Sequence, residues 1–374
     1  MIKGIYISNH NLNDKSSGVT KKIQMQLEAF KKNNILIEAP NLFSDTVVDK
    51  IIRRIPFFKC SFDKAANKYI LQAIKNGINF VYIRHSVCSI HLISLLKVLK
   101  KNGITIIYEF PTFPYDRNGY GVSWNLFMIK DKFSRNKLHK YVDIGVNFSG
   151  YSEIYGVKCI AINNGINAEE IKVHKVNRSG NKSIKFLGVA LLAYWNGYDR
   201  LINAIHSYYS TANNPIDIEF HIAGNGDAYN SLKLLVRKNN LENRIIFHGF
   251  ISGEELNQLY DECDIGVGTL APSRKYKGHI MSTLKTKEYT AKGMPFIKAD
   301  FDSIFDNKSI DFSFNVKDDE SPIDISQIIQ WYNNLVDRYG EENLINHIRS
   351  FAEKELSWEK QLRPVFDYIN KEIN

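Results

Sequence analysis

The sequence has few cysteines and no long apolar run, and each absence excludes a class of protein. Its four cysteines, Cys60, Cys88, Cys159 and Cys263, lie far apart, and no CxxC pair occurs. This spacing suggests neither a zinc site nor a redox motif, and it predicts reduced, buried thiols in a cytoplasmic protein. No apolar run approaches the ~20 residues that a membrane-spanning helix requires. Residues 1–11 turn polar too soon for a secretory signal.

The rest of the composition is ordinary for a globular protein. The 374 residues, 44% hydrophobic and 24% charged, suit two domains that each bury a core of their own. The net charge of +9 is uneven, because residues 1–176 carry 26 Lys and Arg against 13 Asp and Glu, and residues 177–374 carry 23 against 27. The basic first half predicts an anionic partner, such as a membrane surface, a lipid-linked phosphate or nucleic acid.

Apolar strands alternate with helical patterns along most of the chain. Strands are expected at 2–8, 35–39, 80–84, 104–110 and 143–148, and again at 184–190, 216–223, 244–247 and 264–268. Such alternation is typical of an α/β protein with parallel, doubly wound sheets. The polar segment 172–182 separates the two series and is a natural linker. We therefore expect a first domain at 1–175 and a second at 176–355.

The segment Cys263–Ala299 is the most informative part of the sequence. It begins with a short apolar strand and continues into a basic loop that contains Arg274, Lys275 and Lys277. A helix and a second apolar strand follow. In a parallel sheet this order brings the basic loop to the edge where ligands bind.

The helix in this segment has the features of an anion site. Ser282 or Thr283 is expected to cap it, and Lys285 and Glu288, three residues apart, share one face. A helix N-terminus surrounded by cations suits a diphosphate, and a carboxylate one turn deeper can accept hydrogen bonds from a ribose diol. The pattern predicts a sugar-nucleotide site. The alternative is a surface helix whose charged side chains are only solvated.

Beyond Glu288 the sequence continues with Ala291, Gly293 and Pro295. This Glu, Ala-x-Gly-x-Pro pattern resembles the donor site of retaining glycosyltransferases of the GT-B fold, a family-four-like class that includes bacterial surface-polysaccharide enzymes. The resemblance implies two Rossmann-like domains facing across a cleft that holds the active site. It also implies a last helix, 356–374, that crosses back to the first domain. In this class the Glu binds the nucleotide ribose.

The sequence departs from that class where the donor diphosphate is usually held. Val189 stands where an Arg is expected, and Asn196 stands where a Lys is expected. The positive charge that binds the diphosphate is therefore expected to come from the basic residues of the later loop and helix: Arg274, Lys275, Lys277 and Lys285. Asn196 and its neighbour Trp195 are still expected to touch the donor. The alternative for Trp195 is simple packing between domains.

A second departure concerns the donor sugar. The class carries another Glu eight positions before the ribose Glu, and here that position is Ile280. In the class that first Glu contacts the sugar, so His279 or a backbone group is expected to take its place. The departure also leaves open a chain that binds a nucleotide sugar without turning it over.

Turns at strand ends add weaker signals. Gly18 lies between the first strand and a helix, where a glycine lets backbone N–H groups approach a phosphate, although a plain loop glycine fits as well. Gly224 opens a turn that closes a strand of the second domain, in a region where the class places base and phosphates. Phe250 is expected either to pack against the base or to belong to the core.

The first domain carries a candidate acceptor site. The stretch Tyr108–Asp116 together with Arg84 and His85 resembles a subgroup of capsule and O-antigen glycosyltransferases. Glu109 and Asp116 are expected to face the cleft, where carboxylates can accept hydrogen bonds from acceptor hydroxyls. The alternative is that the prolines of this stretch shape a loop and that Asp116 pairs with the next residue.

Two segments of the basic half mix apolar and cationic residues, at 50–59 and 125–140. Such segments can lie on an anionic bilayer, and the alternative is a solvated face over a core. Their pairing in one half favours peripheral contact with a membrane. Nucleic acid is disfavoured because no recognised nucleic-acid module occurs.

Together these features give one hypothesis. The chain is expected to be a hexosyltransferase-type glycosyltransferase (EC 2.4) that moves a sugar from a nucleoside diphosphate sugar, expected to be UDP-linked, to a lipid-linked oligosaccharide at the inner face of the cell membrane. The resemblance implies retention, no cofactor and no essential metal. Lys285, Glu288 and Arg274 are the predicted catalytic residues. Two alternatives stay open: a silent binding subunit, and another sugar-nucleotide enzyme such as a non-hydrolysing epimerase.

Overall fold

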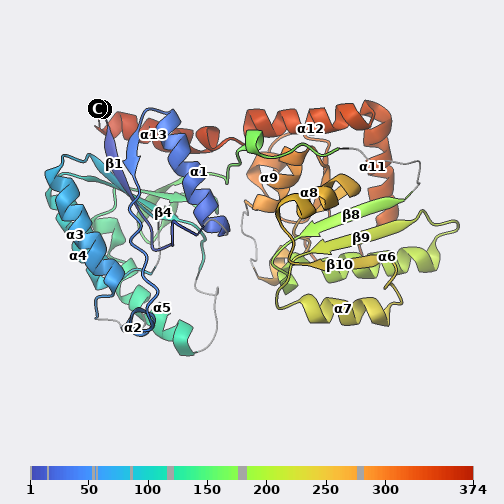
Figure 1. Cartoon of the computed structure of the whole chain (residues 1–374), viewed down its shortest axis with the longest axis horizontal. Helices are drawn as coiled ribbons and strands as arrows, with labels where there is room; N and C mark the ends of the chain where they lie inside the picture. Colours follow the sequence, from blue (N-terminus) through green and yellow to red (C-terminus); the bar gives the residue numbers. More distant parts are fainter. Residues whose placement is uncertain are drawn as a thin grey trace. The chain divides into compact units, whose positions relative to one another are not determined.

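The computed structural model describes residues 2–14, 17–52, 55, 58–84, 87–115, 122–175, 183–275 and 282–373. The chain divides into two compact units, which are described one at a time (Figure 1). Unit 1 comprises Met1–Asn163 and Trp358–Asn374, and unit 2 comprises Asn164–Ser357. Unit 2 thus begins before the predicted linker. One reason is that the Ile166 N–H donates to the Leu356 carbonyl at 2.7 Å, which ties residues after 163 to this unit.

Unit 1 is built on a seven-stranded sheet of order β2-β1-β3-β4-β5-β7-β6. Every neighbouring pair is parallel except β6 with β7, which form an antiparallel pair at one edge. The strands are β1 (Lys3–Ile7), β2 (Leu36–Glu38), β3 (Phe80–Arg84), β4 (Thr105–Phe110), β5 (Ile144–Asn147), β6 (Glu153–Ile154) and β7 (Val157–Ala161).

Helices cover both faces of this sheet because its central strands are apolar on both sides. The helices are α1 (Gly18–Lys32), α2 (Val47–Ile52), α3 (Ser61–Lys75), α4 (Ile90–Lys101), α5 (Val122–Arg135), η1 (Leu138–Lys140) and α13 (Trp358–Ile373). Figure 1 shows α3 and α4 on one face and α1 and α13 on the other. Phe30 of α1 meets Phe366 of α13 edge-on, with ring centroids 5.1 Å apart.

Unit 2 contains a six-stranded sheet of order β10-β9-β8-β11-β12-β13, in which every pair is parallel. The prediction of two doubly wound parallel sheets is confirmed. The strand β13 was not expected from the sequence, because its three residues carry little apolar pattern. The strands are β8 (Ile184–Val189), β9 (Ile218–Ala223), β10 (Ile245–Gly249), β11 (Ile265–Val267), β12 (Phe296–Lys298) and β13 (Ser313–Asn315).

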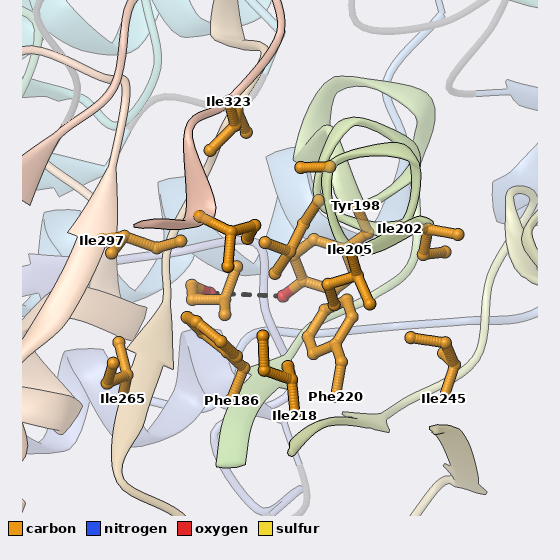
Figure 2. Close-up of a cluster of buried hydrophobic side chains, with 14 of the residues drawn as sticks. Phe186, Tyr198, Ile202, Ile205, Ile218, Phe220, Ile245, Ile265, Ile297 and Ile323 are labelled. Carbon is orange, nitrogen blue, oxygen red and sulfur yellow. Dashed lines mark hydrogen bonds between the residues drawn. The ribbon is translucent and has the colours of Figure 1, made fainter. Parts of the chain in front are cut away.

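The helices of unit 2 also lie on both faces of its sheet, with α6 and α7 on one side and α8 and α9 on the other (Figure 1). The helical elements are η2 (Ala168–Glu170), η3 (Tyr194–Asn196), α6 (Tyr198–Thr211), α7 (Tyr229–Lys238), α8 (Gly253–Glu262), η4 (Pro272–Arg274), α9 (Leu284–Lys292), α10 (Ser303–Asp306), α11 (Ile325–Tyr339) and α12 (Glu341–Glu355). In the core beneath α6, Tyr198 packs on Phe220, and its hydroxyl donates to the Val267 carbonyl at 3.4 Å (Figure 2).

Two observations bear on the classes considered from composition. The four cysteines are free thiols, and three of them are buried, with Cys159 half-buried. Among the helices that the structure describes, none is both long and apolar enough to cross a bilayer.

Candidate functional site

The position of α9 is fixed by Tyr289, whose ring packs against β11. Gly266 of β11 makes room for the ring of Tyr289, since a Cβ on this glycine would lie 2.5 Å from the ring. The Tyr289 hydroxyl donates toward the carbonyls of Leu187 and Val267, each 3.1 Å away. Because α9 runs back from the carboxyl edge of the sheet, its N-terminus lies at that edge, where parallel α/β sheets bind ligands.

The first turn of α9 carries no side-chain cap within the described part of the chain. Both predicted caps are engaged elsewhere. The Ser282 hydroxyl accepts from the Asn164 N–H at 2.8 Å, and the Thr283 hydroxyl pairs with that of Thr286 at 3.1 Å. The first turn also lacks an acidic residue. Among the described residues, no side chain therefore caps these backbone N–H groups, and they and the positive end of the helix dipole suit an anion.

Lys285 stands in this open first turn. Its Nζ is buried and has no hydrogen-bond partner among the described residues, and it lies 5.7 Å from the centroid of the Tyr198 ring. Burial lowers the pKa of Lys285 to about 8, although the carboxylate of Asp300 acts in the opposite direction. A buried ammonium without a partner is costly. Its place beside the helix N-terminus makes it the strongest candidate for an anion-binding side chain.

Glu288 follows one turn deeper in α9, as the sequence predicts, and is half-buried. Its carboxylate lies close enough to Tyr260 of α8 to raise the pKa of that phenol, on which burial has the larger effect. Burial lowers the pKa of Lys292, and Glu288 opposes that effect. The Glu288 carboxylate thus lies on the side of α9 that packs near α8.

Arg274 was predicted to hold a diphosphate, and the structure places it in a different role. Its guanidinium makes paired hydrogen bonds of 2.8 Å to both oxygens of Asp199 and to both oxygens of Glu320. It also donates to the Tyr194 carbonyl at 2.8 Å. These carboxylates raise the pKa of Arg274 further above its ordinary value. Two carboxylates already neutralise its charge, so Arg274 joins three segments of unit 2 rather than offering a free cation.

The residues of η3 hold their own loop in place. Asn196 is buried, and its Oδ1 accepts from the Ala193 N–H at 2.7 Å. The Asn196 carbonyl also accepts from the Leu270 N–H at 2.8 Å. Trp195 is half-buried, and the Nζ of Lys275 lies 3.7 Å from its ring centroid, within the range of a cation–π contact. The predicted donor contacts of Asn196 and Trp195 stay a prediction.

Gly224 and Phe250 were also predicted to bind the donor, and only Gly224 is required by the packing of its own loop. Gly224 has a φ of +131°, and a Cβ here would lie 1.8 Å from the Ala190 carbonyl oxygen, so loop packing by itself requires the glycine. Phe250 follows β10 and is 78% exposed, which excludes the core alternative and leaves its ring open to contact a base.

In unit 1, Gly18 is the first residue of α1, and a Cβ there would meet nothing within 4 Å. The Ser17 hydroxyl caps this helix by accepting from the Thr20 N–H at 3.3 Å. Four predicted site residues lie outside the described residues: His85, Asp116, Lys277 and His279.

The structure contradicts the expectation that Glu109 faces the cleft at the strand ends. Its side chain is fully buried beneath α1, because β4 is a central strand whose two faces are both covered. The carboxylate accepts from Gln26 at 2.9 Å, from Tyr82 at 2.7 Å and from Arg84. These donors, with Lys22 nearby, lower the pKa of Glu109 against the effect of burial. Glu109 and Arg84 therefore form a buried ion pair.

Arg84 also borders a pocket at the carboxyl ends of β1 and β3. Apolar side chains form most of its wall, and its polar lining residues are Asn9, Asp63, Arg84, Ser89, His91 and Lys130. Of the predicted acceptor residues that the structure describes, only Arg84 lines this pocket.

Sequence reasoning missed a cluster of buried charges around the loop after β12. Lys287 of α9 forms an ion pair with Asp302, and both side chains are fully buried. Lys298 pairs with Asp306 at 2.7 Å and donates to the Asp300 carbonyl at 2.7 Å. The signal available from the sequence was the position of these acidic residues directly after a strand, at the edge where ligands bind.

Within the described ranges no set of three or more His, Cys, Asp or Glu side chains is arranged to hold a metal ion.

Comparison with known proteins bears on both the fold and the family of the chain. Residues 155–277 match the family model described as Glycosyl transferases group 1. A search of curated proteins found no match.

Solved structures match nearly the whole chain. HepE of Anabaena, solved in complex with UDP, has a TM-score of 0.61 and 12% identity, with 99% of each chain covered. Sucrose-phosphate synthase of Thermosynechococcus elongatus has a TM-score of 0.65 and 13% identity, with 99% of this chain and 98% of that chain covered. The lipopolysaccharide outer core galactosyltransferase WaaB, in its apo form, has a TM-score of 0.59 and 13% identity, with 98% of this chain and 100% of that chain covered.

The chain therefore has the two-domain GT-B fold, as predicted. The match over residues 155–277 lies mainly in unit 2, and it supports a glycosyltransferase.

Proposed function

We propose that the protein transfers a sugar from a nucleoside diphosphate sugar to a glycan acceptor. The observation that carries the proposal is found at the N-terminus of α9. Among the described residues this helix end has no side-chain cap, and the buried ammonium of Lys285 in its first turn has no hydrogen-bond partner. A diphosphate would satisfy both groups at once. The Glycosyl transferases group 1 match over residues 155–277 supports the same reading.

UDP is the proposed nucleotide. Anabaena HepE, which has the same fold, was solved with UDP and with UDP-glucose. Glu288, one turn beyond Lys285, is the proposed partner of the ribose hydroxyls. Phe250, exposed at the end of β10, is available to pack against the base.

The proposed reaction breaks the bond between the anomeric carbon and the diphosphate and forms one to an acceptor oxygen, with retention. Negative charge develops on the leaving diphosphate, and fixed N–H groups and an ammonium in a buried site stabilise such charge strongly. The acceptor proton passes to the departing phosphate, so the scheme needs no separate side-chain base. Arg274 contributes indirectly, by holding the loop that leads toward α9.

Calorimetry with a panel of nucleoside diphosphates tests this site. The wild type should bind UDP, and Lys285→Ala and Glu288→Ala should each weaken binding. Lys238→Ala removes an exposed lysine of α7 and serves as the matched control. A folded wild type that binds no nucleotide would refute the proposal. UDP binding without transfer to any glycan would instead indicate a silent binding subunit.

We also propose that the acceptor is lipid-linked and that unit 1 contacts an anionic membrane. On α5, Leu126, Ile129 and Phe133 are exposed by 42%, 44% and 66%, and their spacing places them along one face of the helix. Lys132, next to Phe133, is exposed, and so are Lys137 and Lys140 just after the helix, whereas Arg135 is ion-paired with Asp131. Apolar side chains among cations are the composition of a helix that lies in a bilayer interface.

The helix α2 and the segment after it add to this surface. Val47, Val48 and Phe58 are exposed by 73%, 63% and 59%. Lys50 and Lys59 are exposed within the same stretch. Figure 1 shows α2 and α5 both at the lower end of unit 1.

Vesicle co-sedimentation tests the membrane proposal. Wild-type protein should bind vesicles that contain anionic lipid, and should bind less well at high salt. Phe133→Ser should weaken binding, whereas Leu234→Ser, which alters a residue of unit 2 that is 64% exposed, should not. Equal binding by all three proteins would refute a membrane surface on α5.

A further inference from the structure

Some of the charged side chains buried around α9 and the loop after β12 have no hydrogen-bond partner among the described residues. The set comprises three lysines and three aspartates: Lys285, Lys287, Lys298, Asp300, Asp302 and Asp306. Four of them form two ion pairs, Lys287 with Asp302 and Lys298 with Asp306. Among the described residues, the Lys285 ammonium and both carboxylate oxygens of Asp300 have no hydrogen-bond partner.

Lys285 and Asp300 are close but do not pair with each other. Each influences the pKa of the other, yet they form neither a hydrogen bond nor an ion pair within 4.0 Å. Asp300 is only 2% exposed, and burial raises its pKa to about 6. Burying two unpaired charges opposes folding, so the stability of the fold gives no reason to keep them.

The loop holds the Asp300 backbone firmly. Lys298 bonds to the Asp300 carbonyl at 2.7 Å while paired with Asp306. Two residues on, Asp302 is held by Lys287 and caps α10 by accepting from the Ile304 N–H at 3.2 Å. On the preceding side, the Ala299 N–H donates to the Thr269 carbonyl at 2.8 Å. A firmly supported backbone of this kind is what a ligand-binding residue requires.

The chemistry of the two groups specifies what fits between them. An ammonium only donates hydrogen bonds, and a carboxylate only accepts them. A hydroxyl does both, so one hydroxyl can accept from Lys285 and donate to Asp300. The proposed diphosphate lies at the same helix end, and Glu288 faces α8 while Asp300 follows β12. A sugar joined to this diphosphate would bring its hydroxyls to the same end of α9 as Lys285 and Asp300.

We propose that Asp300, with Lys285, binds a hydroxyl of the transferred sugar and so helps to determine which sugar the protein accepts. This inference rests on the proposed function. It gives the sugar a carboxylate contact in a chain that has Ile280 where the resembled class has its first Glu.

The test compares UDP with UDP-sugars on the same variants. Wild type, Asp300→Asn and Asp300→Ala are titrated with UDP, UDP-glucose, UDP-galactose and UDP-N-acetylglucosamine. For the sugar that wild type prefers, affinity should fall tenfold or more in Asp300→Ala, while UDP affinity should change little. Asp337→Asn removes an exposed carboxylate of α11 and controls for net charge.

Thermal unfolding of the free protein supplies a second readout. Removal of an unpaired buried charge should leave the melting temperature of Asp300→Asn unchanged or raise it. A structural ion pair would lower it. A deoxy analogue of the preferred UDP-sugar, lacking the bound hydroxyl, should bind wild type and Asp300→Ala equally.

The outcomes separate the two proposals. Wild type that binds no nucleotide refutes the proposed function, and this inference with it. UDP binding with equal losses for UDP and UDP-sugar in Asp300→Ala overturns the sugar contact alone. So does an unchanged UDP-sugar affinity, which would indicate that only water bridges Lys285 and Asp300.

Discussion

The charge of Lys285 should make nucleotide binding depend on pH. Its pKa is lowered to about 8, so the ammonium is lost as the pH rises through that value. If only the protonated form binds a diphosphate, affinity scales with the protonated fraction. That fraction falls from about nine-tenths at pH 7 to about one-tenth at pH 9, which corresponds to roughly tenfold weaker binding, or about 1.4 kcal/mol. Bound diphosphate should raise this pKa again, so binding near pH 9 should take up a proton.

Calorimetry of UDP binding at pH 7, 8 and 9 measures both effects. Buffers of different ionisation enthalpy report the proton uptake, and the terminal phosphate, with a pKa of about 6, stays ionised throughout. Lys285→Arg keeps its charge over this range and should bind with little dependence on pH. Equal wild-type affinity at pH 7 and pH 9, in protein that remains folded, would refute the role assigned to this ammonium.

Three further predictions concern stability. Lys287→Met should reduce the free energy of unfolding by about 3–5 kcal/mol by leaving Asp302 buried and unpaired. Lys287→Met with Asp302→Leu should recover most of that loss, apart from about 1 kcal/mol for the lost cap of α10, and urea denaturation distinguishes the two. Arg274→Ala should lower stability by about 1–2 kcal/mol, because its ion pairs are partly exposed, yet leave UDP affinity almost unchanged in the same titrations. Glu109→Gln should also cost about 3–5 kcal/mol at pH 7. Because the pKa of Glu109 is lowered, its contribution disappears as the pH falls through that pKa, so unfolding curves of variant and wild type should converge in acid.

The fold was predictable because its signals are local. The strands of both sheets are short apolar runs separated by helical patterns, and β3 was predicted over its observed bounds, Phe80–Arg84. The antiparallel pair β6 and β7 and the strand β13 were not expected. The first two are two and five residues long and the third is three, so packing rather than periodicity determines them.

The site was predictable only in part, because residue type does not reveal which charges are already paired. Lys285 and Glu288 are on α9 as predicted from their spacing. From the sequence, Arg274 and Glu109 looked equally available to bind a ligand. In the structure each is held in an ion pair, Arg274 with a residue 46 positions away and Glu109 with one 25 positions away. Asp300 was overlooked for the converse reason. Its interest lies in having no partner within the described chain, which only the arrangement of the surrounding charges reveals.

Which of the predicted cations are already paired determines which of them can support catalysis. Val189 and Asn196 replace cations that the resembled class uses, and Arg274 is neutralised by Asp199 and Glu320. Of the predicted cations that the structure describes, Lys285 is the one whose ammonium is buried without a partner. Charges interact more strongly in a buried site than in water, so one such ammonium beside an open helix end can do what several solvated cations do elsewhere. The same burial makes its protonation sensitive to pH, which links the strength of the site to its pH dependence.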